Sequence, residues 1–201
     1  MNARTLLRQY GTALRAMIVA TLVLGVAYTL VVTAVGQLAL GHRANGSEIE
    51  SGGEVVGSSL SGQSFTDPVG AALPEWFQSR PSAAGDGYDA SASSGSNWGP
   101  ENPDLIAAIA ERRAAVAESD GVDPASVPVD ALTASASGLD PHVSPEYARE
   151  QVDRVAAARD LPVDEVRDLV EQHVQGRDLG YLGEPTVNVL ELNVALEALG
   201  R

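Results

Sequence analysis

The apolar positions of this 201-residue chain are most concentrated near its beginning. Residues 16–35 (AMIVATLVLGVAYTLVVTAV) form an uncharged run that only threonine, tyrosine and glycine interrupt. A helix of this length spans ~30 Å, which is the thickness of the hydrocarbon core of a bilayer. No face of the run is polar, which disfavours the alternative of a buried core helix. The pattern therefore predicts a transmembrane helix, and we place its bounds at residues 14–38.

The charges on either side of this run predict its orientation. Arg4, Arg8 and Arg15 precede it without any acidic residue, whereas only His42 and Arg43 follow it closely. By the positive-inside rule, residues 1–13 are cytoplasmic and the chain after about Leu40 is extracytoplasmic. The alternative is a cleaved signal peptide with a weak site near residues 39–41, although such peptides have a shorter apolar region of about 7–15 residues. We favour a retained single-pass anchor in the cytoplasmic membrane.

The pattern after the anchor predicts a linker and one further domain. Residues 44–53 (ANGSEIESGG) are typical of a flexible exit from the membrane, so we take 39–53 as a linker. Residues 54–201 suit a single domain, since about 150 residues can bury a core. Aromatic residues make up only 4% of the chain, so that core must consist mainly of alanine, valine and leucine. Short strands are expected at 54–60, at 131–134 and at 186–190.

Helix starts in this domain are marked by capping sequences. Asn102-Pro103-Asp104 and Ser144-Pro145-Glu146 each combine a capping side chain, a proline suited to the first turn and an acidic residue at the positive end of the dipole. The first helix should end near residues 119–121, and Leu161-Pro162 should break the second.

A third helix is expected over 164–174, where apolar residues recur at helical spacing. His173 lies on the same stripe, and Gly176 is the expected C-cap. A short helix or an extended tail should follow at 192–199. The chain therefore reads as α+β, with one N-terminal transmembrane helix followed by a single mixed α/β extracytoplasmic domain.

The charge balance of the chain excludes one class of partner. The chain carries a net charge of −14, and all 27 acidic residues lie after residue 43. A body this acidic repels phosphates, so we expect no nucleic acid partner. The acidity is compatible both with a solvated surface and with an attraction for cations.

Missing residue types exclude several chemistries. The chain has no cysteine, which excludes disulfides and thiolate metal sites, and no lysine, which excludes P-loop, kinase and Schiff-base chemistry. A hydrolytic triad of Ser137, Asp140 and His142 is not expected, although the residue types are present. The three residues are neighbours in a turn, and no Gly-x-Ser-x-Gly elbow occurs. No pair of histidines has metal-ligand spacing. We expect no catalytic residue and no metal site.

Two loops contain more chemistry than a spacer needs. Residues 80–100 (RPSAAGDGYDASASSGSNWGP) have the composition of a linker, but Arg80, Tyr88, Asn97 and Trp98 favour an ordered functional loop. Asp140-Pro141-His142 forms the second candidate, which also reads as a simple turn.

Three long motifs carry a family resemblance: RPSAAGxGYDA, TASxSGLDPHVSP and LGYLGEPxVNVLxLN. With the preceding single span, they resemble the C subunit (KdpC) family of Kdp-type potassium-transporting P-type ATPases over nearly the whole chain. Departures from the family pattern are small. The family usually has an aliphatic residue at the position of Ser61, glycine at the positions of Ser94 and Ala136, and often leucine at the position of Trp98.

The resemblance implies a non-catalytic accessory subunit of a high-affinity, ATP-driven potassium uptake complex. Such a subunit is needed for assembly and is proposed to act as a catalytic chaperone that raises the ATP affinity of the pump subunit. The implied partners are a channel-like potassium-binding subunit, a P-type pump subunit that holds the catalytic residues, and a small hydrophobic subunit, all in the lipid bilayer. Gln151 matches the position suggested for nucleotide contact. A generic membrane-anchored scaffold or binding protein is the alternative.

The arginine bias conflicts with direct nucleotide contact, because it places the domain outside while ATP is inside. A stabilising or gating role at the external potassium entrance, with an indirect effect on ATP affinity, fits better. We expect the partner interface at residues 80–103 first and 137–145 second, although both could be internal turns. The candidate residues are Arg80, Pro81, Tyr88, Asn97, Trp98, Asp140 and His142.

Overall fold

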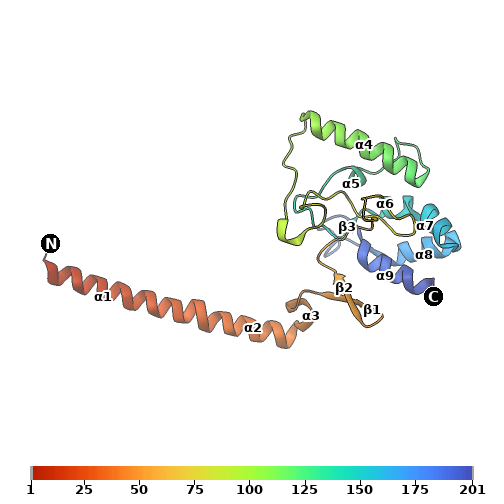
Figure 1. The fold of residues 1–201 in the computed structure, drawn as a ribbon. Helices are drawn as coiled ribbons and strands as arrows, with labels where there is room; N and C mark the ends of the chain where they lie inside the picture. Colours follow the sequence, from red (N-terminus) through yellow and green to blue (C-terminus); the bar gives the residue numbers. More distant parts are fainter. Residues whose placement is uncertain (1, 201) are drawn as a thin grey trace. The chain divides into compact units, whose positions relative to one another are not determined.

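The computed structural model describes residues 2–200, which divide after Ser47 into two compact units (Figure 1). The first unit is dominated by one continuous helix, Ala3–Ala39. It comprises α1 (Ala3–Ala20), a π-helical stretch η1 (Thr21–Ala27) and α2 (Tyr28–Ala39). Within residues 2–200 it is the one helix long and apolar enough to cross a membrane. The predicted single-pass helix is therefore present, and at 37 residues it is about 55 Å long, more than the hydrocarbon core requires.

The helix turns sharply at its end. Leu40 leaves the helical region, with φ −134° and ψ 35°, and the short α3 (Gly41–Ala44) follows. The side-chain amides of Gln37 and Asn45 exchange two hydrogen bonds, at 3.1 and 3.2 Å. This pair fastens α3 back against the end of α2.

A hairpin begins the second unit. β1 (Glu48–Ser51) pairs antiparallel with β2 (Glu54–Ser58), and Gly52 and Gly53 join them with φ of 63° and 86°. A two-residue hairpin turn of type I′ has positive φ at both positions, which glycine adopts without strain. The strand expected at 54–60 is confirmed as far as Ser58. The flexible exit expected over 44–53 is wrong for Glu48–Ser51, because that segment finds a partner strand.

The remaining elements surround a small antiparallel sheet in the order β3-β5-β4. The strands are β3 (His142–Val143), β4 (Val174–Gln175) and β5 (Thr186–Asn188). The helices are η2 (Ala90–Ala92), α4 (Pro103–Asp120), α5 (Val129–Leu132), α6 (Pro145–Glu150), α7 (Val152–Arg159), α8 (Val163–His173) and α9 (Val189–Leu199). The domain is mixed α/β, as the sequence predicts.

The core is built from valine, leucine and alanine, as expected from the scarcity of aromatic residues. Val155, Val166, Val170, Leu192 and Leu196 are completely buried. Two aromatic side chains join them, since Phe77 and Tyr147 are only 1% and 3% exposed. Within this core α6, α8 and α9 pack against the central strand β5, and α7 packs against α8. Figure 1 shows these four helices next to one another.

Helix starts follow the predicted caps. Asn102 Oδ1 accepts a hydrogen bond from Asp104 N at 2.7 Å, and Ser144 Oγ accepts one from Tyr147 N at 3.1 Å. α4 ends where Gly121 adopts φ 68°. His173 lies at the end of α8 with Nδ1 2.8 Å from Leu169 O, so its ring packs against its own helix.

Two local expectations are wrong, and a third is confirmed only in part. Residues 131–134 were expected to be a strand, but α5 begins after Pro128 and buries Ala131 and Leu132. Gly176 does not cap α8, because the chain extends at Val174 straight into β4. The strand expected at 186–190 stops at Asn188, whose side chain accepts from Glu191 N and starts α9 early.

Candidate functional site

The two loops expected to carry the site lie against each other. Arg80 Nη1 contacts Asp140 Oδ2 at 2.8 Å. The same guanidinium donates from Nε and Nη2 to Thr133 O, at 3.4 and 3.2 Å. We call residues 80–98 and 133–142 the loop pair. Arg80 therefore links both parts of the loop pair with one charged and two main-chain contacts.

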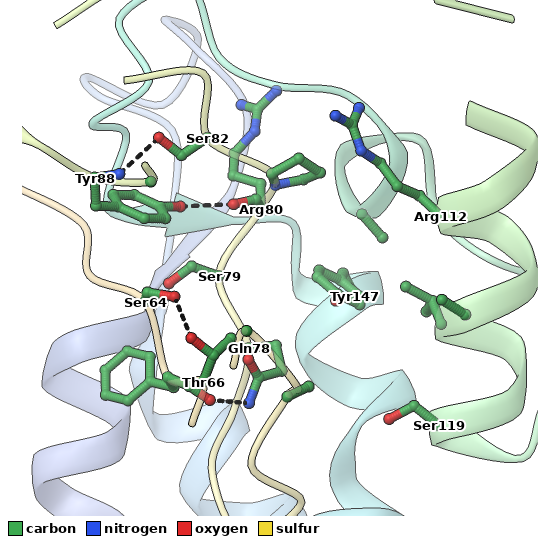
Figure 2. Close-up of a pocket in the computed structure, with 18 of the residues that line it drawn as sticks. Ser64, Thr66, Gln78, Ser79, Arg80, Ser82, Tyr88, Arg112, Ser119 and Tyr147 are labelled. Carbon is green, nitrogen blue, oxygen red and sulfur yellow. Dashed lines mark hydrogen bonds between the residues drawn. The ribbon is translucent and has the colours of Figure 1, made fainter. Parts of the chain in front are cut away.

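Tyr88 bonds to other residues of the first loop and is connected to the second loop through Ser82. Its hydroxyl donates to Arg80 O at 2.7 Å, and its main-chain N donates to Ser82 Oγ at 2.9 Å (Figure 2). Ser82 Oγ in turn donates to Gly138 O at 2.6 Å. Burial raises the pKa of Tyr88 to about 12, so its phenol remains a hydrogen-bond donor at neutral pH.

Gly138 permits this close approach. Its φ is +68°, and a Cβ at this position would lie 2.7 Å from both Ala84 N and Ser94 O. Two further bonds end on Ser137 O, from Ser94 N at 3.0 Å and from Ser93 Oγ at 2.9 Å. The loop over 80–100 is thus ordered by hydrogen bonds and is not a simple spacer.

Asp140 and His142 form a turn. Asp140 Oδ1 accepts from His142 N at 3.1 Å and lies 3.4 Å from His142 Nδ1. Burial opposes ionisation of Asp140, but hydrogen bonds from His142 and the Arg80 guanidinium together lower its pKa. The Ser137 hydroxyl accepts a hydrogen bond from Leu139 N at 3.1 Å and lies 3.4 Å from Ser135 Oγ. The arrangement therefore stabilises a turn and not a nucleophilic triad.

The remaining interface candidates differ in exposure. Pro81 is half-buried in the loop pair. Asn97 and Trp98 lie at its exposed end, where Asn97 has φ 53° and the Trp98 side chain is 40% exposed. The loop pair thus offers an aromatic surface next to a fixed polar framework.

Gln151 lies away from any surface. It is completely buried, and its Oε1 accepts from Gln78 N at 2.6 Å and from Arg154 Nη2 at 2.7 Å. Its Nε2 donates to Gln78 O at 3.2 Å and to Tyr147 O at 3.3 Å. The Gln151 amide, which the resemblance implies as a nucleotide contact, is therefore enclosed in this structure and engaged by hydrogen bonds within the domain.

Several polar residues of this network were missed from the sequence. Arg154 and Asp120 form an ion pair at 2.6 Å, with side chains only 7% and 3% exposed. Asn193 is 1% exposed and bonds to Phe77. A signal for Asn193 existed, since it lies among Val189, Leu190, Leu192 and Leu196 in a mostly apolar helix.

Comparisons with known proteins agree with the motifs. The family model described as "KdpC: K+-transporting ATPase, c chain" matches residues 10–198. A Kineococcus radiotolerans protein is 58% identical over 193 residues, covering 96% of this chain and 95% of its own. Proteins of Methylococcus capsulatus and Mycobacterium tuberculosis are each 50% identical, covering 96% of this chain and 100% and 99% of their own. All three are named potassium-transporting ATPase KdpC subunit. The resemblance is thereby confirmed, and the chain belongs to the KdpC family, the c chains of K+-transporting ATPases.

Proposed function

We propose that this chain is a non-catalytic, membrane-anchored accessory subunit of a potassium-transporting ATPase complex. The observation that supports it most is the helix Ala3–Ala39, whose apolar stretch has no buried residue in the chain itself. An apolar surface of this size is stable only in lipid or against the helices of a partner. The relatives are named as subunits of such an ATPase.

The polar residues of the domain fit a structural role. Arg80, Tyr88 and Asp140 bond to one another or to main-chain groups, and Gln151 is fully engaged inside the domain. The absence of lysine also excludes the usual phosphate-binding sites. In the proposal, ATP hydrolysis takes place on a P-type pump subunit, which assembles with a channel-like potassium-binding subunit and a small hydrophobic subunit.

We place residues 1–13 in the cytoplasm, the anchor over 14–38 in the cytoplasmic membrane, and the connecting segment and the domain that follow it outside. Three arginines precede the span, Arg4, Arg8 and Arg15, whereas only His42 and Arg43 follow it closely, and this difference supports the orientation. With the domain outside, any catalytic-chaperone effect on ATP affinity is indirect and passes through the assembled complex.

The loop pair is the proposed contact with the channel-like subunit. Its main-chain and Arg80–Asp140 bonds hold it in one conformation before binding, which lowers the entropy cost of association. Exposed tryptophan is a common anchor in protein interfaces, and Trp98 is suitably exposed. A domain held there would stabilise the complex and control the outer entrance for potassium.

Orientation is tested by labelling. The chain has no cysteine, so Ser93→Cys and Thr5→Cys each introduce a single thiol, one in the loop pair and one near the N-terminus. We expect a membrane-impermeant maleimide to label Cys at 93 on intact cells and Cys at 5 only after lysis. The reverse pattern would overturn the orientation and permit direct contact with ATP.

Assembly is tested by co-purification in mild detergent. We expect the unmodified chain to bring down a polytopic channel-like subunit and a P-type ATPase, and Trp98→Ala to reduce their recovery. Tyr181→Ala, which truncates another exposed aromatic residue outside the loop pair, is the control. Normal potassium-stimulated ATPase activity in cells lacking this chain would refute the accessory role. Co-purification without a channel-like subunit would favour a generic scaffold.

A further inference from the structure

A cavity of about 350 Å³ opens beside the loop pair, between α4, α6 and the segments around residues 64–72 and 78–88 (Figure 2). Its volume is in the range that binds small molecules. Arg80 and Tyr88 of the loop pair line it, but neither the anchoring nor the docking role described above assigns it a ligand. The side chains of its lining determine which ligand it accepts.

Two arginines stand at one end of the cavity. Arg112 Nη1 donates to Leu132 O at 2.9 Å, and Arg80 Nη2 donates to Thr133 O at 3.2 Å. Because these carbonyls belong to consecutive residues, both guanidinium groups are anchored at the same point of the chain. Figure 2 shows both side chains extending toward the same side of the cavity.

The charge at this end is incompletely balanced. Arg80 is paired with Asp140, whereas among residues 2–200 no carboxylate lies within 4.0 Å of the Arg112 guanidinium. Two positive groups and one negative group leave one uncompensated positive charge, in a chain whose overall charge is −14. This balance favours a ligand with a single negative charge. A guanidinium recognises a carboxylate particularly well, through parallel hydrogen bonds.

The acidic residue of the lining does not cancel this charge. Asp120 follows Arg112 by eight residues on α4, which separates them by about 12 Å along the helix axis. It is already neutralised by Arg154 at 2.6 Å. The basic end of the cavity is thus distinct from the end at Asp120.

The rest of the lining is mainly apolar. Phe65, Ala115, Val116 and Ala131 contribute carbon surface, and Tyr147 adds an aromatic ring. The hydroxyls of Ser64 and Thr66 are 3.0 Å apart and bond to each other, which reduces their demand for water (Figure 2). A ligand with an apolar body and one acidic end would match this surface.

We propose that the cavity binds a small organic carboxylate, with its carboxylate between Arg112 and Arg80 and its apolar body against Val116 and Tyr147. Arg112 supplies the uncompensated charge, and Arg80 supplies a second guanidinium already fixed by Asp140 and Thr133. The site is independent of the docking role of Trp98, so either proposal can fail alone.

The test uses the full chain in detergent micelles and fluorine NMR of 4-fluorobenzoate. We expect broadening of its signal that unlabelled benzoate reverses, with no comparable effect on 4-fluorobenzyl alcohol, which has the same ring without charge. Arg112→Gln should weaken binding by at least about tenfold. Arg113→Gln is the matched control, since Arg113 is the next residue of α4, is exposed and does not line the cavity.

Arg112→Gln also removes the hydrogen bond to Leu132 O, so a second variant separates charge from folding. Arg112→Lys retains a positive charge and should bind more tightly than Arg112→Gln. Absence of binding by the unmodified chain at about 10 mM would overturn the proposal. Equal binding of the alcohol, or equal affinities in Arg112→Gln and Arg113→Gln, would also overturn it. The comparison of acid and alcohol on the unmodified chain decides the matter even if both Arg112 variants fail to fold.

Discussion

The side-chain amide of Asn193 bonds to both main-chain polar groups of Phe77. Phe77 N donates to Asn193 Oδ1 at 2.9 Å, and Asn193 Nδ2 donates to Phe77 O at 2.9 Å. Gln151 makes the same two-way contact with the next residue, Gln78. Two buried amides thus take the place of a neighbouring strand for an irregular segment, and Phe77 can be inserted into the core without leaving its main chain unsatisfied.

Asn193→Ala removes both of these bonds. Phe77 N–H and C=O would then be buried without partners, so we expect the free energy of unfolding to fall by about 2–4 kcal/mol. Urea unfolding of the full chain in detergent, followed by circular dichroism, measures the change. Gln172→Ala, at an exposed position on α8, serves as control and should change stability by less than about 0.5 kcal/mol. An equal loss in both variants would contradict the role of Asn193.

Gln151→Ala distinguishes a structural role from nucleotide contact. Since Gln151 is completely buried and bonds to Gln78, Tyr147 and Arg154, we expect a loss of about 1–3 kcal/mol in the free energy of unfolding. Photo-crosslinking of an azido-ATP analogue to this chain should be absent both before and after substitution. An unchanged unfolding midpoint together with crosslinking that Gln151→Ala abolishes would instead establish a direct contact.

Gly138→Ala tests the contact within the loop pair. Gly138 and Gly180 both have positive φ, at 68° and 82°, but only the added Cβ at 138 would meet main-chain atoms closer than 3 Å. Both alanine variants carry the same kind of backbone strain, so their difference isolates the contact. We expect Gly138→Ala to be less stable than Gly180→Ala by about 1–3 kcal/mol.

The same substitution should loosen the first loop of the pair. The main-chain N of Tyr88 donates to the Ser82 hydroxyl, which in turn donates to Gly138 O. Chymotrypsin cleavage after Tyr88 should therefore be faster in Gly138→Ala than in Gly180→Ala. Equal stability and equal cleavage rates would show that the two parts of the loop pair do not depend on each other.

Glu150 makes stability depend on pH. Its Oε1 is buried and has no hydrogen-bond partner within the described part of the chain. Burial first, and then the charges of Asp120 and Asp130, raise the pKa of Glu150 from 4.5 to about 7. The folded state therefore binds this proton more tightly than the unfolded state. The resulting stabilisation is complete below about pH 4.5 and is lost as pH rises toward 7.

We expect the urea midpoint of the unmodified chain to fall between about pH 5 and pH 7 more steeply than that of Glu150→Gln, which resembles the protonated form at all pH values. Glu146→Gln, at an exposed position of the same helix, should retain the steep fall. If the curves of the unmodified chain and Glu150→Gln are parallel, Glu150 is not the group responsible.

The sequence could locate a helix start wherever the signal was local. Asn102 and Ser144 bond within three residues of themselves, so their caps were readable without knowledge of the fold. The same approach failed at residues 131–134, because α5 is determined by the burial of Ala131 and Leu132 in a core assembled from distant segments. It also missed β1, whose stability comes from pairing with β2.

The candidate site was predicted only in part. Arg80, Tyr88, Asp140 and His142 were recognisable as unusual residues in small, polar loops, but nothing local indicated that Arg80 meets Asp140 across 60 positions. The role of Arg112 was not visible either, since its partner is a main-chain carbonyl of α5 and main-chain groups have no sequence signature.

The sequence by itself determined the apolar anchor, the acidity of the chain, the capped helix starts and the family, because each depends on composition or on residues close together in the chain. Tertiary structure decided that the two candidate loops form one framework and that Gln151 and Asn193 are buried. It also brought Arg80 and Arg112 to one cavity. These features depend on contacts between residues separated by up to 116 positions, such as Phe77 and Asn193, and such contacts leave no periodic pattern in the sequence.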